Sequence, residues 1–352
     1  RLRGAAKRAG PAVARSVLTR RRALALRRST VAPPDGIANA LDATGSLRQP
    51  RAMVILMDGG MGQELRRRWS GPIDGLWSAR VLAERPESVE TAHRDFVQAG
   101  ARVLTVSSYA VTPQRLAAHG LEDRFEALQA SAVERARRAR GDEDVRIAGC
   151  VPPLVASYRP DLAPPPAEAE ASYARIVAAQ NEGVDLFLCE TLSSVAEARA
   201  AVPAAVASGR PVWAAFTLAD EPVPKTPRLR SGEPLDAGVD AAAELGAQVI
   251  LLNCSRPEAF DAALPDLVRR FPRVGAYANG FTSASGLHDA GTVDALERRV
   301  DLDPDAYAER ALAWVDAGAH VVGGCCEVGP AHIDAIRRAL ADRGEAIEGP
   351  TV

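Results

Sequence analysis

From residue 52 onward, short apolar runs rich in valine, isoleucine and leucine alternate with longer segments whose hydrophobic residues recur at helical spacing. Several of the longer segments, including residues 88–100 and 306–318, end in the glycine that commonly follows a helix. The pattern therefore predicts strands and helices in alternation. Eight apolar runs are the expected strands: residues 52–60, 101–109, 145–153, 184–192, 211–218, 247–255, 273–280 and 319–326.

The expected strands are apolar almost throughout rather than at every second position. This is typical of a parallel sheet that helices cover on both faces. Eight strand–helix units in a chain of this length match the size of a (β/α)8 TIM barrel. An open, doubly wound α/β sheet is the alternative. We expect a single catalytic barrel domain over residues 51–345, followed by a tail over residues 346–352.

The first 50 residues lie outside this alternation. Residues 1–34 carry ten basic side chains and no acidic one, which leaves the rest of the chain near −12 within a net charge of −2. Such a stretch could contact nucleic acid, but it has no aromatic residue to stack on bases. Its Arg, Ala and Leu content also suits an organelle transit peptide, and a wrongly assigned start is a third interpretation. We expect residues 1–50 to be a disordered, dispensable leader.

Composition narrows the class of protein. The chain is 47% hydrophobic and 25% charged, which is typical of a globular protein, and no apolar run is long enough to cross a membrane. Five cysteines without disulfide-like spacing favour a reducing compartment. We expect a cytoplasmic protein, or an organellar one if residues 1–34 are a transit peptide, with no membrane or nucleic-acid partner.

Reactive side chains gather where the expected strands end. In a (β/α)8 barrel the active site lies at the carboxyl ends of the strands. Acids, thiols, an amide and an aromatic residue occupy these ends although apolar residues would serve stability better. The residues concerned are Asp58, Tyr109, Glu190, Cys254, Asn279, Cys325 and Cys326.

Three of these residues are cysteines. Cys254 ends the sixth strand, and Cys325 and Cys326 follow "VVGG" at the end of the eighth. Strands six and eight flank strand seven, so their ends lie on one sector of the rim. Three thiolates would bind zinc and leave a fourth position open, as in catalytic zinc sites. The alternative is three buried cysteines that act as small apolar fillers; the matching depth of Cys254 favours the metal.

Several segments together resemble the homocysteine S-methyltransferases. The segments are "MDGGMGQEL", "LWSARVLAERPESV", "CETL", "NCS" and "VVGGCCEVGPAHI", and they occur in order at the expected strand ends. The resemblance covers about residues 52–342 and is closest to the enzymes that use S-methylmethionine. It implies a zinc-binding barrel that methylates homocysteine to methionine.

The resemblance also implies roles for individual residues. Cys254, Cys325 and Cys326 would hold zinc, and Asp58 and Glu190 would bind the α-ammonium group of the substrate.

The remaining implied roles concern the substrate carboxylate and the methyl donor. Backbone amides around Gly59 and Gly60 would receive the carboxylate, and Asn279 is expected at the substrate site. Trp77 and Tyr109 would line the donor pocket, because aromatic faces attract sulfonium or quaternary ammonium cations.

The chain departs from the family pattern in three places. Glu327 follows the cysteine pair where relatives place Gly or Arg, and "CVPP" (residues 150–153) and "YANGF" (residues 277–281) replace forms closer to "SVGP" and "YPNSGE". Thr191 stands where betaine-using enzymes carry Tyr, so we expect a sulfonium donor, S-methylmethionine or S-adenosylmethionine, rather than betaine. We expect Cys150 and Cys189 to be packing residues.

Two alternative functions stay open. One is methyl transfer to another thiol or to a selenol, or with betaine as donor. The other is a non-catalytic, zinc-binding barrel that serves as an interaction scaffold, against which the intact Asp58, Glu190 and cysteine trio argue.

Overall fold

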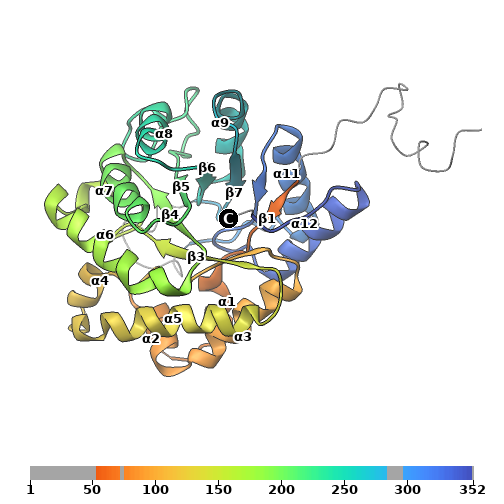
Figure 1. Cartoon of the computed structure of the whole chain (residues 1–352). Coiled ribbons are helices and arrows are strands. Elements are labelled where there is room, and N and C mark those ends of the chain that lie inside the picture. The colour runs from red at the N-terminus through yellow and green to blue at the C-terminus, as the bar shows by residue number, and fades with distance from the viewer. Residues whose placement is uncertain (1–52, 72–74, 284–295, 351–352) are drawn as a thin grey trace, which may run out of the picture. The chain divides into compact units, whose positions relative to one another are not determined.

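The computed structural model describes residues 53–71, 75–283 and 296–350, and within them strands and helices alternate as predicted (Figure 1). Every strand falls inside its predicted run. The strands are β1 (Ile55–Leu56), β2 (Val103–Thr105), β3 (Arg146–Val151), β4 (Leu186–Leu192), β5 (Val212–Phe216), β6 (Val249–Asn253), β7 (Val274–Tyr277) and β8 (Val321–Val322).

Helices connect consecutive strands. The α-helices are α1 (Met61–Arg67), α2 (Trp77–Glu84), α3 (Pro86–Gln98), α4 (Pro113–Ala117), α5 (Phe125–Arg140), α6 (Pro166–Gln180), α7 (Val195–Val206), α8 (Leu235–Glu244), α9 (Pro257–Arg270), α11 (Pro304–Asp316) and α12 (Pro330–Asp342). Short 3-10 helices are η2 (Glu122–Arg124), η3 (Pro160–Leu162) and η4 (Asn181–Gly183). No helix in the described part of the chain is both long and apolar enough to cross a bilayer.

The sheet closes on itself. Neighbouring strands pair in parallel in the order β1-β8-β7-β6-β5-β4-β3-β2. The two ends of this order also meet, because Met57 forms a parallel bridge with Val103 and the Asp58 N–H donates to the Val103 carbonyl at 3.0 Å. Figure 1 shows the helices placed around the strands. The fold is therefore the predicted (β/α)8 barrel, and the doubly wound alternative is wrong.

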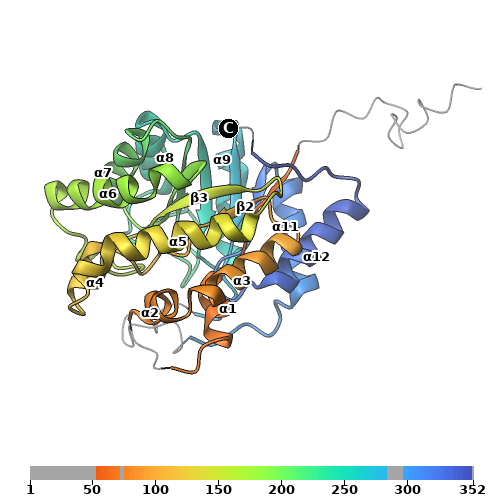
Figure 2. The same ribbon diagram turned by 60° about the horizontal axis from the view of Figure 1, so that its bottom comes forward.

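Hydrophobic side chains fill both sides of the barrel wall. The outer core lies between strands and helices and includes Phe187, Phe216 and Trp314, and α3 packs beside α5 and α11 beside α12 (Figure 2). All eight strands or the residues that extend them contribute to the interior, as expected for a barrel. The interior residues are Met57, Val103, Ala148, Leu186, Leu188, Trp213, Ala215, Val249, Leu251, Tyr277 and Val321.

The expected tail joins the barrel at its amino-terminal end. The Val54 N–H donates to the Ala346 carbonyl at 3.0 Å, and Ile347 forms a parallel bridge with Val54. Residues 346–348 therefore extend the sheet beside the start of β1. The predicted leader, residues 1–50, lies outside the described residues.

Candidate active site

Three thiols meet at the carboxyl ends of β6 and β8. The Cys254 Sγ lies 2.8 Å from the Cys325 Sγ and 3.8 Å from the Cys326 Sγ, and all three sulfurs lie within 4.8 Å of one another. Among the described residues, no other group of three or more His, Cys, Asp or Glu side chains is close enough to share a metal ion. The sequence prediction that these three cysteines converge is thus consistent with the geometry.

The number of these thiols and their chemical type suit zinc. Zn–S bonds of about 2.3 Å in a tetrahedral site place neighbouring sulfurs about 3.8 Å apart, and catalytic sites keep one coordination position for substrate. The Cys254–Cys326 separation of 3.8 Å meets this spacing, and a shift of about 1 Å would bring Cys325 to it. All three cysteines also line a cavity. Cysteines that only filled space in an apolar core would not be expected to do so.

The backbone at this rim is strained. In the described part of the chain, four non-glycine residues have a positive φ: Tyr158 (62°), Thr191 (59°), Cys254 (48°) and Glu327 (66°). Each lies at the rim, in the loop after β3, at the end of β4, after β6 or after β8. Such conformations cost on the order of 1–3 kcal/mol each and persist where the surroundings enforce them, commonly at functional sites.

Gly59 and Gly60 let the turn after β1 approach the cysteine loop. A Cβ on Gly59 would lie 2.1 Å from the Val328 carbonyl oxygen, and one on Gly60 would lie 2.4 Å from the Cys325 carbonyl oxygen. The Gly60 N–H donates to the Val328 carbonyl at 2.8 Å. Gly60 lines the cavity, but its amide already donates to the Val328 carbonyl and not into the cavity, so the expected carboxylate role of this amide stays a prediction.

A tyrosine and an arginine support Cys254 from neighbouring loops. The Tyr158 hydroxyl donates to the Cys254 Sγ at 2.9 Å, and the Arg230 guanidinium lies 4.1 Å from the centre of the Tyr158 ring. The buried Asp220 carboxylate holds Arg230 in an ion pair of 3.1 Å. Hydrogen bonds from the thiols of Cys325 and Cys326, with smaller contributions from Tyr158 and Arg230, hold the pKa of Cys254 well below its usual value. These groups favour a thiolate at Cys254.

Two buried carboxyls share the cavity with the thiols. The Asp58 carboxylate accepts from the Thr105 N–H at 2.8 Å and from the Thr105 hydroxyl at 3.2 Å. Burial raises the pKa of Asp58 to about 8 although the Thr105 hydrogen bonds lower it, and burial raises the pKa of Glu190 to about 7. Neither carboxylate forms an ion pair with a basic side chain among the described residues. Both acids are therefore suited to receive a cationic ligand.

An irregularity at the end of β4 sets the position of Glu190. The β4–β5 register shifts between Cys189 and Leu192, and bulges of this kind re-aim side chains near active sites. The Asn253 side chain holds the shift: its Oδ1 accepts from the Thr191 N–H at 3.2 Å and its Nδ2 donates to the Thr191 hydroxyl at 3.0 Å. Asn253 is thus a positioning residue of the site that sequence reasoning did not single out.

Cys150 also contacts Glu190. Its thiol donates to the Glu190 Oε1 at 3.0 Å. The Gln180 side chain fixes the Cys150 backbone, because its Oε1 accepts from the Cys150 N–H and its Nε2 donates to the Cys150 carbonyl, both at 2.9 Å. Cys150 and Cys189 both pack in the outer core, as predicted, but Cys150 has an additional role because it donates a hydrogen bond to Glu190.

The cavity above these groups has a volume of about 490 Å³. Of the predicted site residues, Asp58, Gly59, Gly60, Tyr109, Glu190 and the three cysteines line it. Asn279 does not line it and is fully buried. Trp77 is the first residue of α2, and its side chain lies outside the described part of the structure.

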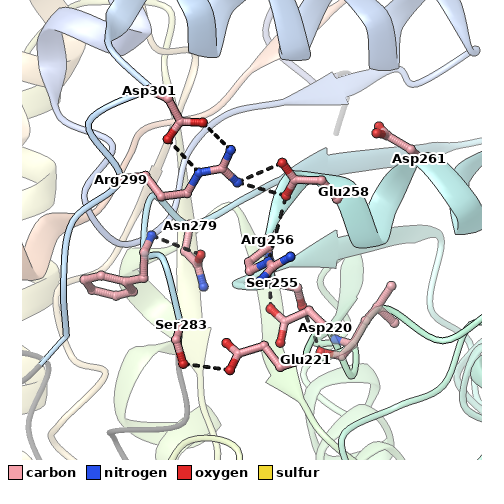
Figure 3. A network of polar contacts seen from close by, with 12 residues as sticks. Asp220, Glu221, Ser255, Arg256, Glu258, Asp261, Asn279, Ser283, Arg299 and Asp301 are labelled. Atoms are coloured by element: carbon pink, nitrogen blue, oxygen red, sulfur yellow. Dashed lines mark hydrogen bonds and ion pairs between the residues drawn. The ribbon is translucent and has the colours of Figure 1, made fainter.

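Asn279 belongs to the packing of the loop after β7, where its Oδ1 accepts from the Phe281 N–H at 3.3 Å. Beside it, Arg299 binds Glu258 at 2.8 Å and Asp301 at 2.6 Å (Figure 3). These contacts attach the loop to the start of α9, next to Cys254. The structure therefore places Asn279 in the packing of this loop and not in the cavity wall, where a substrate-binding residue was expected.

Glu327 has a partner of its own. Its carboxylate forms an ion pair of 3.9 Å with Arg298, and Glu327 is not among the residues that line the cavity. The negative charge that it adds beside the cysteine pair is therefore partly compensated.

Comparisons with known proteins agree with this geometry. The family model for homocysteine S-methyltransferase matches residues 55–340. The chain is 34% identical over 310 residues to the homocysteine S-methyltransferase of Escherichia coli (strain K12), covering 81% of this chain and 94% of that protein. It is 28% identical over 329 residues to a selenocysteine Se-methyltransferase of Brassica oleracea var. italica, covering 82% of this chain and 89% of that protein.

A solved structure extends the similarity to three dimensions. The metallated form of the homocysteine methyltransferase MmuM from Escherichia coli superposes with a TM-score of 0.68 at 30% identity, covering 83% of this chain and 97% of that chain. The region matched by the family model, residues 55–340, includes the strand ends that carry the thiols and carboxyls. With the family model spanning nearly the whole barrel, this chain belongs to the homocysteine S-methyltransferase family.

Proposed function

We propose that this chain is a zinc-dependent enzyme that moves a methyl group from a sulfonium donor, S-methylmethionine or S-adenosylmethionine, to the sulfur of L-homocysteine. The observation that carries the proposal is that three thiols and two buried carboxyls line one cavity. The Escherichia coli relatives support it, since one acts on homocysteine and its metallated form has been solved.

The acceptor amino acid would be held at both of its ends. Zinc bound to Cys254, Cys325 and Cys326 would favour the thiolate form of an entering thiol at neutral pH. Asp58 and Glu190 would pair with the α-ammonium group. Burial disfavours the anionic form of both carboxyls, but the ammonium group would stabilise this form through charge-assisted hydrogen bonds. The α-carboxylate would lie against the turn that begins at Gly59.

The methyl group would then move in one displacement. A bond forms between the homocysteine sulfur and the methyl carbon while the S–CH₃ bond of the donor breaks, and the donor leaves as a neutral thioether. The thiol proton passes to solvent, so no side chain has to act as a base on carbon. The protein supplies position and exclusion of water, and the aromatic residues Tyr109, Tyr158 and Tyr277 line the cavity where a cationic donor would bind.

A direct assay tests this proposal. Zinc-loaded protein should form methionine from homocysteine and S-methylmethionine, and more slowly from S-adenosylmethionine, as measured by chromatography of the products. Betaine should support little turnover. Absence of methionine with every donor would overturn the proposed function, and turnover with betaine at least as fast as with S-methylmethionine would overturn the sulfonium preference.

A selenol acceptor is the second candidate. The selenocysteine Se-methyltransferase of 28% identity supports its inclusion, and a selenolate is a better nucleophile than a thiolate. Selenocysteine has one methylene group fewer than homocysteine between the α-carbon and the nucleophile. The fixed separation of the carboxyls from the thiols should therefore favour one of the two, which competition between both acceptors in one reaction would identify.

Cys150 gives a prediction for the acceptor side. Cys150→Val removes the donor to Glu190, and because this hydrogen bond lowers the pKa of Glu190, fewer carboxylates should be present at pH 7. We expect the KM for homocysteine at pH 7 to rise by about threefold to tenfold, which matches the net contribution of about 0.5–1.5 kcal/mol of a typical hydrogen bond, and the difference to shrink at pH 8.5. Cys150→Ser, which keeps a donor, should stay near wild type. An unchanged KM in Cys150→Val would contradict this role.

A further inference from the structure

The cavity wall contains a cation that has no carboxylate partner among the described residues. Arg115, in α4, lines the cavity and forms no ion pair with any described residue. Its Nη2 donates to the Pro153 carbonyl at 3.1 Å, and its guanidinium lies 5.1 Å from the centre of the Tyr109 ring. Its buried Nε has no hydrogen-bond partner in the part of the chain that the structure describes. The Arg115 guanidinium therefore covers one face of the Tyr109 ring. Its positive charge lies in the wall of the cavity that a cationic methyl donor would have to enter.

A neighbouring amide oxygen is also unpartnered. The Gln114 Nε2 donates to the Ser172 hydroxyl at 2.7 Å and to Glu168 at 3.3 Å. These two bonds orient the amide, and its buried Oε1 is left without a hydrogen-bond partner among the described residues. Gln114 lines the same cavity as Arg115. An anion binder and a hydrogen-bond acceptor thus stand side by side.

We propose that Arg115 and Gln114 form a subsite for the α-amino-acid end of the methyl donor, with the donor carboxylate on Arg115 and its ammonium on the Gln114 Oε1. The inference rests on the proposed function and specifies the class of donor. A sulfonium without a carboxylate would be repelled by Arg115, whereas a donor that carries one is attracted. Betaine has a carboxylate but no N–H to give to Gln114.

The proposal also explains one of the sequence departures. Pro153 belongs to the "CVPP" segment, and its carbonyl holds Arg115 in the cavity. The segment therefore acts on the donor through Arg115 rather than by direct contact of its own polar groups. The "YANGF" segment contributes Tyr277 to the cavity wall and no residue to this subsite.

The test compares two donors that differ only in the carboxylate. S-methylmethionine and (3-aminopropyl)dimethylsulfonium are each used with saturating homocysteine, and kcat/KM is measured for wild type and Arg115→Gln. In Arg115→Gln we expect kcat/KM to fall by about tenfold to a hundredfold with S-methylmethionine. With the donor that lacks the carboxylate it should stay unchanged or rise, because a repelling charge has been removed.

Arg159→Gln is the matched control. Arg159 also lines the cavity, but Asp161 already pairs with it at 2.6 Å and 2.8 Å. Its removal should change the two donors alike and by less than threefold. Thermal denaturation of each variant shows whether it is folded.

The possible results separate this proposal from the function on which it rests. Equal losses with both donors in Arg115→Gln would assign Arg115 a structural role and overturn the subsite. If Arg115→Gln does not fold, the comparison of the two donors with the wild-type protein tests the proposal. Equal kcat/KM for the two donors would overturn it, and a preference for S-methylmethionine of about tenfold or more would support it. If wild type forms no methionine from any sulfonium, the proposed function fails and the subsite falls with it.

Discussion

Replacing Cys254, Cys325 and Cys326 together with serine should remove zinc from the purified protein and abolish methyl transfer. We expect about one zinc per chain in the wild type and close to none in the variant, measured by elemental mass spectrometry. Serine keeps the size of the side chain, but its hydroxyl is far less acidic than a thiol and does not supply the anionic sulfur that zinc binds. The loss of activity should be the largest of any substitution in the barrel.

The matched control is Cys189→Ala. Cys189 lies one residue from Glu190, but its side chain belongs to the outer core and does not line the cavity. This variant should keep its zinc and lose stability only. Full zinc content in the triple serine variant would show that the metal lies elsewhere, and zinc loss in Cys189→Ala would show that general damage to the barrel is sufficient to release it.

The hydrophobic pattern alone predicted the architecture, for a physical reason. A parallel strand covered on both faces must be apolar almost throughout, so each of the eight runs stands out from the helices between them. The same regularity places every strand end on one rim, and this is why Cys254 could be paired with Cys325 and Cys326 across a gap of 70 residues. Regular structure makes distant positions predictable.

Strand alternation also bears on the contact between Cys150 and Glu190. Cys150 lies two residues beyond the interior residue Ala148 on β3, so strand alternation directs it toward the side on which Glu190 lies, although Cys150 also packs with the outer core. Its contact with Glu190 could therefore have been predicted. The direction of the Glu190 side chain could not be predicted. It depends on a register shift that the hydrogen bonds between Asn253 and Thr191 hold in place.

Residues on loops were not predictable in this way. Tyr158 and Arg230 reach the site from loops, and Arg115 reaches it from α4, which is only 5 residues long and too short to show a hydrophobic period. Gly60 illustrates a different limit: a glycine needed for close approach and a glycine that offers its amide to a ligand look the same in a sequence. Asn279 shows that a polar residue at a strand end can serve its own loop.

The second large effect concerns the two carboxyls, and its sign follows from their pKa values. Burial holds the pKa of Asp58 at about 8 and that of Glu190 at about 7, so at pH 6 both are mainly protonated in the free protein. Both must ionise to pair with an ammonium group, and binding therefore releases protons at low pH. Amino-acid binding should weaken by about tenfold or more from pH 8 to pH 6.

L-Methionine is the suitable probe, because it carries the ammonium group but no thiol that titrates. Its dissociation constant should be measured by calorimetry at pH 6, 7 and 8 for wild type and Glu190→Gln. At pH 8 the variant should bind about tenfold to a hundredfold more weakly, the expected loss for a hydrogen bond to a charged group. Its affinity should also depend less on pH, since one of the two titrating carboxyls is gone.

Glu197→Gln separates this effect from the general consequences of a buried acid. Burial also raises the pKa of Glu197 to about 7, but this residue lies in α7, accepts from the Ser193 N–H at 2.6 Å and does not line the cavity. Its substitution should cost stability without changing the affinity for methionine or the pH dependence of binding. Equal affinity of the wild type at pH 6 and pH 8 would show that Asp58 and Glu190 are not the ammonium partners. Equal changes in both variants would show that Glu190 acts through the fold, because only direct pairing with the ligand distinguishes two acids that are buried to similar extents.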